Sequence, residues 1–188
     1  YTLTKFKNSL MINSSMSKNK LDLVIFDMDG TIVQYDSSTF HSSWDAVGMA
    51  TGNYDRWMKL LEYYYPRRDL YTEWTNKNCQ LLQGCSVEVV KQRIFPPPYT
   101  PGFASFCAYL HQQEIKCGIV SSGVDLVANH ILQEQGLDFA LANELHTNGD
   151  FFVGTGEVKV PLWTKNETVR EVIKRYEADP QKTAYFGD

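Results

Sequence analysis

Two aspartates stand two positions apart in the segment Asp27-Met28-Asp29-Gly30-Thr31. On an extended backbone, residues at this spacing point to the same side, so both carboxylates face one way. Gly30 allows the chain to turn sharply behind them. Crowded carboxylates repel each other unless a cation joins them, and Mg²⁺ needs only a few protein oxygens alongside waters and a phosphate. The pair therefore predicts a Mg²⁺ site, and such a site favours a phosphoryl ligand.

Polar residues also stand at the ends of two other expected strands. One strand ends in Ser121-Ser122-Gly123 and the last ends in Gly187-Asp188. Ligands of open parallel sheets bind outside the carboxyl ends of the strands. We therefore expect these segments to meet Asp27 and Asp29 in one cleft, with Asp188 as a third metal ligand.

The elements that would position these residues form an α/β pattern. A short apolar run over residues 21–26 predicts a strand buried on both faces. Helices are expected from after residue 102 to about 113, over 124–135 and over 166–176. Strands are expected over 115–120, 139–145 and 183–186. Residues 151–160 look like a hairpin around two glycines. The alternation predicts a doubly wound parallel sheet, a Rossmann-like core.

Residues 35–98 differ from the rest of the chain because apolar residues recur there at helical spacing and no strand is evident. We expect a helical cap inserted after the first strand, with Ser86 capping its last helix and the prolines at 96–98 as a stiff connection. The α/β core would comprise 21–34 and 99–188, after a loose leader over 1–20. Helical spacing also suggests that the aromatics of this segment form the core of the cap: Trp44, Trp57, Tyr63, Tyr64, Tyr65 and Trp74.

Composition excludes several classes of protein. The 188 residues have average hydrophobicity, and a formal net charge of −4 offers no positive field for nucleic acid or anionic lipid. No apolar run approaches the roughly 20 residues that span a bilayer. The four cysteines show no zinc or redox spacing, and the four histidines show no ligand spacing, which makes structural roles the simplest interpretation. These features favour a cytoplasmic protein with reduced thiols and neither nucleic-acid nor membrane partners.

The DMDGT segment, the strand-ending VSSG, a later lysine and the strand-ending FGD together resemble the haloacid dehalogenase superfamily, and within it the phosphoserine phosphatases. The resemblance covers about residues 21–188, keeps the motifs in family order and includes a helical cap in the expected place. It implies a Mg²⁺-dependent phosphatase, a phosphoric monoester hydrolase acting on a small phosphorylated metabolite.

The same resemblance implies roles for individual residues. Asp27 would attack phosphorus to form an aspartyl-phosphate, and Asp29 would act as general acid and then as general base. Ser121 and a lysine would neutralise the phosphoryl group. We favour Lys165, at the start of the helix before the last strand, over Lys159 in the expected hairpin.

Residues expected to contact the substrate are Thr31, Asp36, Ser122 and Gly123. Asp36 stands nine positions after Asp27, where the family has an acidic residue that meets the substrate amine. In the cap, Asn78 stands where the family has an arginine that meets the substrate carboxylate, and a bidentate arginine contact is not replaced without loss. Phosphoserine is therefore one substrate among several, and the oligomeric state is open.

The chain stops before a second acidic residue that the family places about four positions beyond Asp188, so we expect a core truncated at its C-terminus. Two alternatives stay open: a non-catalytic binding or regulatory module that retains the fold, and a dehalogenase-type hydrolase. Asp29 argues against the latter because a halide leaving group needs no acid.

Overall fold

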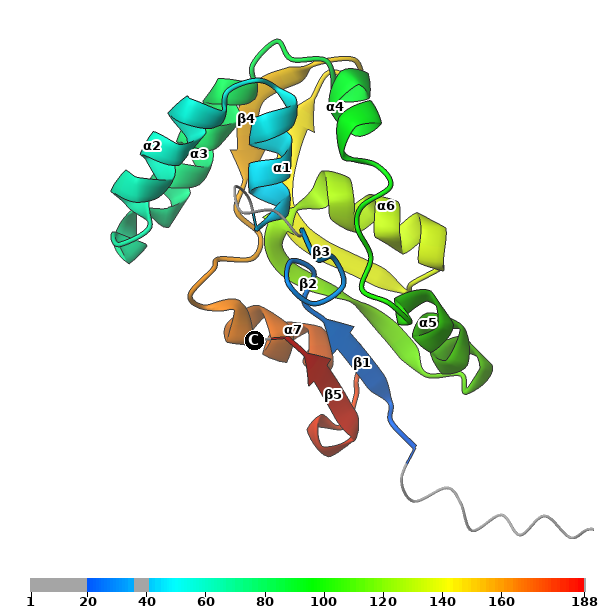
Figure 1. The fold of residues 1–188 in the computed structure, drawn as a ribbon. Helices are drawn as coiled ribbons and strands as arrows, with labels where there is room; N and C mark the ends of the chain where they lie inside the picture. Colours follow the sequence, from blue (N-terminus) through cyan, green and yellow to red (C-terminus); the bar gives the residue numbers. More distant parts are fainter. Residues whose placement is uncertain (1–19, 36–40, 188) are drawn as a thin grey trace, which may run out of the picture.

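The structure is a computed structural model that describes residues 20–35 and 41–187. Asp36 and Asp188 lie outside the described residues, as does nearly all of the expected leader. Five strands form one sheet in the order β4-β3-β2-β1-β5 (Figure 1). The sheet is parallel except for β4, which pairs antiparallel with β3 at one edge. The strands are β1 (Leu23–Phe26), β2 (Lys116–Val124), β3 (Phe139–Thr147), β4 (Phe152–Glu157) and β5 (Thr183–Phe186).

Helices occupy two stretches of the chain. Between β1 and β2 lie α1 (Ser43–Ala50), α2 (Tyr54–Tyr64), the 3-10 turn η2 (Arg68–Leu70), α3 (Tyr71–Leu82), α4 (Val87–Ile94) and α5 (Phe103–Gln112). After β2 come α6 (Asp125–Gln135), α7 (Lys165–Arg175) and the 3-10 turn η3 (Pro180–Lys182). The expected cap boundaries remain a prediction, since apolar residues of α1 to α4 and of β1 and β2 share one hydrophobic cluster.

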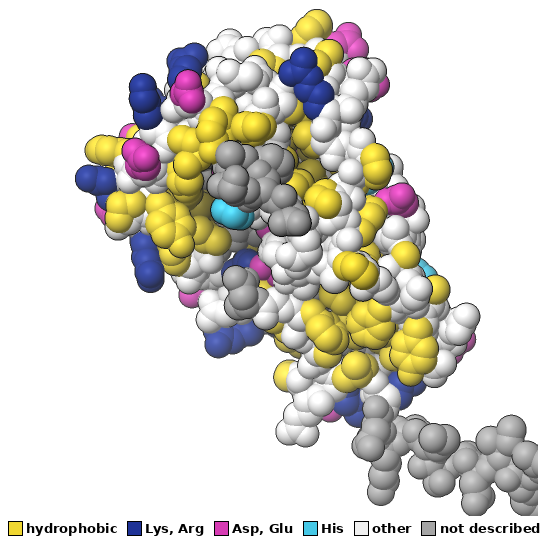
Figure 2. Space-filling model, in the orientation of Figure 1, with side chains coloured by type: hydrophobic (Ala, Val, Ile, Leu, Met, Phe, Trp, Pro, Cys, Tyr) yellow, Lys and Arg dark blue, Asp and Glu magenta, His cyan; other side chains and the backbone are white. Residues whose placement is uncertain are grey.

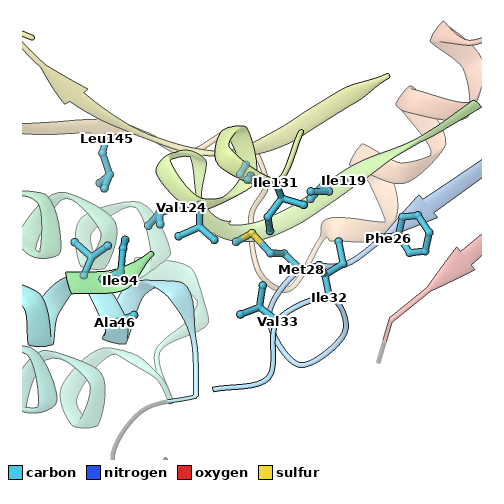
Figure 3. Close-up of a cluster of buried hydrophobic side chains, with 14 of the residues drawn as sticks. Phe26, Met28, Ile32, Val33, Ala46, Ile94, Ile119, Val124, Ile131 and Leu145 are labelled. Carbon is cyan, nitrogen blue, oxygen red and sulfur yellow. The ribbon is translucent and has the colours of Figure 1, made fainter. Parts of the chain in front are cut away.

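β1 is covered on both faces, as its apolar sequence predicts. Val24 and Phe26 join the larger hydrophobic cluster, which also contains the apolar faces of α5 and α6 (Figure 3). Leu23 and Ile25 point the other way, into a smaller cluster with Val172 of α7. Alternate residues of one strand therefore enter two cores, and the doubly wound α/β fold is confirmed.

The order of the strands explains where a site can form. β1 lies between β2 and β5, and the chain leaves β1 toward β2 and β3 on one side but reaches β5 on the other. This reversal opens a crevice at the carboxyl end of β1, which is where open α/β sheets bind ligands. The residues that follow β1 and β2 are therefore held at one edge of the sheet.

The prediction of a hairpin within residues 151–160 is wrong. This segment supplies the single strand β4, whose partner is β3. The two glycines permit packing rather than a turn: Gly154 has φ +81° and lies against Gln83, and a Cβ at Gly156 would lie 2.7 Å from Cys79 Sγ. The reversal occurs earlier, where Asn148 Oδ1 accepts a hydrogen bond from the amide of Phe151.

The predicted cap of the last helix before the prolines is confirmed. Ser86 caps α4 by accepting from the amide of Val89, and Gly136 ends α6 in the left-handed conformation at φ +66°. All four cysteines are free thiols. Among the described residues, no helix is both long and apolar enough to cross a bilayer.

Candidate active site

A cavity of about 420 Å³ opens at the carboxyl ends of β1 and β2. Six of the residues to which the sequence analysis gave catalytic, metal-binding or substrate-binding roles line it: Asp27, Asp29, Ser121, Ser122, Gly123 and Lys165. Thr31 does not; its carbonyl instead accepts a hydrogen bond from Thr100. The interpretation of Asp36 and Asp188 stays a prediction because both lie outside the described residues.

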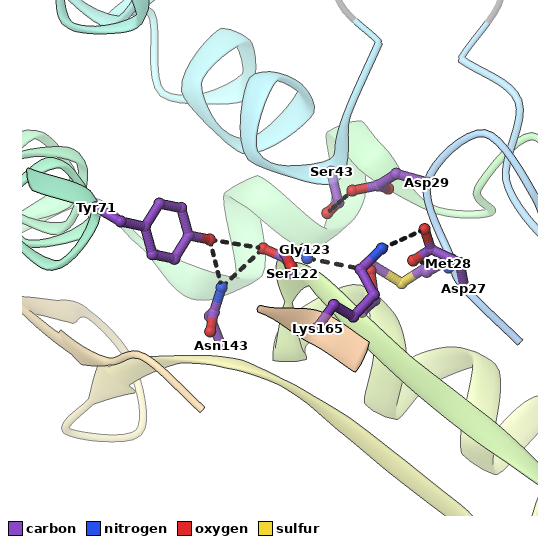
Figure 4. A network of polar contacts seen from close by, with 10 residues as sticks. Asp27, Met28, Asp29, Ser43, Tyr71, Ser122, Gly123, Asn143 and Lys165 are labelled. Carbon is purple, nitrogen blue, oxygen red and sulfur yellow. Dashed lines mark hydrogen bonds and ion pairs between the residues drawn. The ribbon is translucent and has the colours of Figure 1, made fainter. Parts of the chain in front are cut away.

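Asp27 is paired directly with Lys165. Lys165 Nζ lies 2.5 Å from Asp27 Oδ2, although the two residues are 138 positions apart in the chain (Figure 4). The other oxygen, Oδ1, accepts from the amide of Met28 at 2.7 Å. The Asp27 side chain is only 5% exposed. The lysine ammonium and a backbone amide therefore orient this buried carboxylate.

Asp29 has the opposite electrostatic character. Burial raises its pKa from 3.8 to about 7, a hydrogen bond from Ser43 opposes that rise, and the charges of Asp27 and Asp45 add to it. Ser43 Oγ donates to Asp29 Oδ2 at 2.8 Å and accepts from the amide of Val124 at 3.1 Å. Near neutral pH the carboxyl of Asp29 is thus divided between its acid and base forms.

Ser121 lies within β2 and does not cap the helix that follows. β2 continues to Val124, and α6 begins at Asp125 without a side-chain cap. The pairing of β2 with β3 is irregular between Val120 and Val124, so residues 121–123 form a bulge at the cavity wall. Ser121 Oγ accepts from the amide of Gly123 at 3.1 Å, which leaves its own proton free for a ligand.

At Gly123 the bulge packs closely against the residues around the two aspartates. A Cβ there would lie 2.5 Å from Met28 Cε and 2.7 Å from Asp29 Oδ2. Real Cβ atoms essentially never approach so closely. A glycine at this position therefore lets the bulge lie directly against the two aspartates. It is required for close approach, and its φ is not in the left-handed region.

A buried asparagine that the sequence analysis did not single out organises the wall. Asn143, on β3, is fully buried; its Nδ2 donates to the Ser122 carbonyl at 2.7 Å and to Tyr71 OH at 3.0 Å. Its Oδ1 accepts from the amides of Lys159 and Val160, both at 3.0 Å. Asn143 thereby ties the bulge to the segment that leads into Lys165. Figure 4 shows its contacts with Ser122 and Tyr71. Its only sequence signal was a polar residue inside an apolar strand.

Another missed contact also holds the bulge. Trp44 Nε1, from α1, donates to the Ser122 carbonyl at 2.9 Å. The interpretation of the aromatic insert as cap core is correct for Trp57 and Tyr64, which are buried. It is incomplete for Trp44, Tyr65 and Trp74, which line the cavity together with Trp57 and Tyr71. It is wrong for Tyr63, which is 52% exposed. Helical spacing shows which residues share a face but cannot show whether that face meets a core or a cavity.

The competing lysine, Lys159, lies in a different environment. Its Nζ pairs with Glu144 at 2.8 Å and with Glu157 at 3.6 Å. His146 completes a group whose ligand atoms all lie within 4.8 Å of one another. These side chains are partly or largely exposed, and Lys159 already forms ion pairs with both glutamates, so the group does not call for a metal.

The cavity itself fits Mg²⁺ better. Asp27 and Asp29 supply hard oxygen donors, and Asp29 Oδ1 is buried without a hydrogen-bond partner among the described residues. A buried carboxylate oxygen left unpaired is costly, and a cation is one group that would satisfy it. The donor set therefore agrees with the ion that the sequence predicts.

Comparisons with known proteins agree with this geometry. The family model of the haloacid dehalogenase-like hydrolases matches residues 24–188. A phosphoserine phosphatase from Archaeoglobus fulgidus is 27% identical over 88% of this chain and 47% of its own length. One from Saccharomyces cerevisiae is 25% identical over 88% of this chain and 53% of its length. The chain thus spans about half the length of these curated relatives.

Solved structures show the same fold. The structure of a substrate-bound phosphoserine phosphatase complex has a TM-score of 0.72 and 23% sequence identity, and the match covers 90% of this chain and 78% of that one. At this identity the likeness concerns the fold alone.

Proposed function

The chain belongs to the haloacid dehalogenase-like hydrolases, and from this premise we propose that it is a Mg²⁺-dependent phosphomonoesterase that works through an aspartyl-phosphate on Asp27. The observation that carries the proposal is the pair of unlike carboxyls in one cavity. Asp27 is paired directly with the Lys165 ammonium, while burial raises the pKa of Asp29 to about 7. Two carboxyls only two positions apart in the sequence can therefore serve different roles, Asp27 as the nucleophile and Asp29 as the proton donor.

In the first step the Asp27 carboxylate attacks phosphorus, and the bond from phosphorus to the ester oxygen breaks. The departing alkoxide takes its proton from Asp29, which becomes a carboxylate. In the second step a water attacks the phosphorus and gives a proton to Asp29. The bond between phosphorus and Asp27 then breaks, which releases phosphate and restores both residues to their starting states.

The remaining residues neutralise and position the phosphoryl group. The Lys165 ammonium and the Ser121 hydroxyl both line the cavity and can contact phosphoryl oxygens. Asp27 and Asp29 would hold Mg²⁺, together with Asp188 as the sequence predicts. When bound, the ion supplies charge neutralisation for the phosphoryl oxygens. The cytoplasmic location of the protein also stays a prediction.

The test is hydrolysis of p-nitrophenyl phosphate by the full chain with Mg²⁺, with EDTA, and with Mg²⁺ restored. We expect activity that EDTA abolishes and Mg²⁺ recovers. Asp27→Asn should remove it, whereas Asp55→Asn, a matched change at an exposed position on α2, should leave it intact. Release of halide from a 2-haloacid, or no phosphatase activity in any arm, would contradict the proposal and favour one of the two alternatives.

A further inference from the structure

The part of the cavity beyond the carboxylates is walled by aromatic rings. Trp44, Trp57, Tyr65, Tyr71 and Trp74 contribute to it, along with Leu61 and Leu162. The rings come from α1, from α2 and its C-cap residue Tyr65, and from α3, while Leu162 lies in the segment before α7. Figure 2 shows hydrophobic side chains gathered over α2 and α3 on the molecule's surface. A leaving group attached to a phosphate at Asp27 would extend into this aromatic compartment.

The rings form a box and not a slot. Trp74 is nearly perpendicular to both Tyr71 and Tyr65, with interplanar angles of 85° and 89°. Trp44 and Trp57 are tilted by 36° to each other. A flat ligand stacks best between parallel faces, whereas rings at right angles present several faces to one compact group. This arrangement suits a rounded group more than a planar one.

The charge of the compartment favours a cation. Among the described lining residues, Lys165 is the only lysine or arginine, and its ammonium is paired with Asp27. Asp45 also lines the cavity and adds negative charge. Arg68 does not line it; its guanidinium lies 5.5 Å from the ring centroid of Trp163. His41 also lines the cavity. A leaving group with a carboxylate would therefore meet no unpaired lysine or arginine among the described lining residues.

Four lining residues have a buried polar atom with no hydrogen-bond partner among the described residues: Asp29 Oδ1, Trp74 Nε1, Asn78 Oδ1 and Ser122 Oγ. Among the groups away from the carboxylates, Trp74 Nε1 is a donor and the amide oxygen of Asn78 is an acceptor. Asn78 is 4% exposed, and its Oδ1 is buried with no donor among the described residues. An amide oxygen in this state presents the negative end of its dipole to whatever fills the cavity. It is suited to an N–H donor or to the positive face of an ammonium.

We propose that the substrate is a phosphomonoester of an ammonium-bearing alcohol that carries no carboxylate, with the cation enclosed by the aromatic rings between Asp45 and Asn78. This inference rests on the proposed function and names its substrate class. Aromatic faces attract cations through their quadrupole, and the attraction grows where water is excluded. Because the cation is in the leaving alcohol, the same compartment orients the ester oxygen toward Asp29.

Two substrates of nearly equal shape isolate the charge: phosphocholine and its uncharged analogue 3,3-dimethylbutyl phosphate. We expect kcat/KM to be about tenfold higher for phosphocholine, the size of one desolvated cation–π contact. Phosphoethanolamine should also exceed phosphoserine, which adds a carboxylate to the same ammonium. Equal rates for the charged and uncharged esters, or a preference for phosphoserine that Arg68→Ala abolishes, would overturn the proposal.

Substitutions assign the effect to the rings. Trp74→Leu should reduce the preference for phosphocholine over its analogue, while Trp74→Phe should retain most of it. Tyr109→Leu, at an exposed aromatic on α5, serves as the matched control and should change neither. A Trp74→Leu variant with an undiminished preference would contradict the role of the box.

Choline binding and p-nitrophenyl phosphate hydrolysis, measured separately, distinguish a failure of the proposed substrate class from a failure of the proposed phosphatase activity. Calorimetry should show that choline binds the full chain at least about tenfold more tightly than 3,3-dimethylbutanol does. This result is expected whether or not p-nitrophenyl phosphate is hydrolysed. If p-nitrophenyl phosphate is hydrolysed but choline shows no advantage, the substrate class is wrong and the phosphatase stands. If choline binds but no phosphate ester is cleaved, the cation site stands and the proposed function fails.

Discussion

Replacing Asn143 tests whether the cavity wall depends on one buried side chain. In Asn143→Ala, the amides of Lys159 and Val160 lose their shared acceptor, and the Ser122 carbonyl loses its shortest hydrogen bond. Val160 is fully buried, so its amide cannot turn to water, whereas the Lys159 side chain is 32% exposed. The Ser122 carbonyl keeps its bond from Trp44.

The magnitude follows from these counts. A buried donor left without a partner costs about 1–3 kcal/mol. One fully buried amide and one half-buried amide therefore predict that the free energy of unfolding falls by about 2–4 kcal/mol. With a urea m-value of roughly 2 kcal/mol/M, the midpoint of unfolding should fall by about 1–2 M. The segment before Lys165 also loses its anchor, so kcat should fall even where the variant is fully folded.

The assay is equilibrium urea unfolding followed by tryptophan fluorescence, with p-nitrophenyl phosphate hydrolysis measured well below the midpoint. Asn129→Ala, at an exposed position on α6, is the matched control and should change stability by less than about 0.5 kcal/mol. If the free energy of unfolding of Asn143→Ala lies within about 0.5 kcal/mol of the value for the unsubstituted chain, the reasoning about the buried amides is refuted.

The remaining predictions concern the reacting groups. Lys165→Met should lower kcat by about 10²-fold or more because it removes the charge beside the nucleophile, whereas Lys159→Met should leave kcat unchanged; the reverse result would reassign the lysine. With an alkyl phosphate, kcat should fall as pH rises through about 7, where Asp29 loses its proton. Ser43→Ala removes a hydrogen bond that favours the ionised form of Asp29, so this limb should move to higher pH by roughly one unit; a move to lower pH would contradict the assignment. Gly123→Ala should abolish activity, because its Cβ would lie 2.7 Å from Asp29 Oδ2, and a variant with near-normal kcat would show that the wall can yield.

The sequence was enough to predict the fold and the residues that follow β1 and β2. A continuous apolar run specified β1 as a strand buried on both faces, and the alternation of elements specified a wound sheet. Spacing also placed Asp27 and Asp29 on one side, and both line the cavity. These inferences succeed because they depend on local periodicity and on a general property of parallel sheets.

The rest depended on contacts between distant segments. Nothing near Asn143 in the sequence indicates that it joins Ser122 to Val160, and nothing near Ser43 indicates that it donates to Asp29 across 14 positions. The glycines at 154 and 156 resemble turn residues until α3 is seen to pack against them. Aromatic residues at helical spacing likewise serve a core or a cavity according to the neighbours that the fold provides.

The central claim is that Asp27 carries the phosphoryl group during turnover, and rapid acid quench of the reaction followed by peptide mass spectrometry tests it most directly. The account predicts a mass increase of about one phosphoryl group, roughly 80 Da, on the peptide containing Asp27. The increase should be absent from Asp27→Asn. A phosphoryl group found on another residue, or steady turnover by Asp27→Asn, would contradict it.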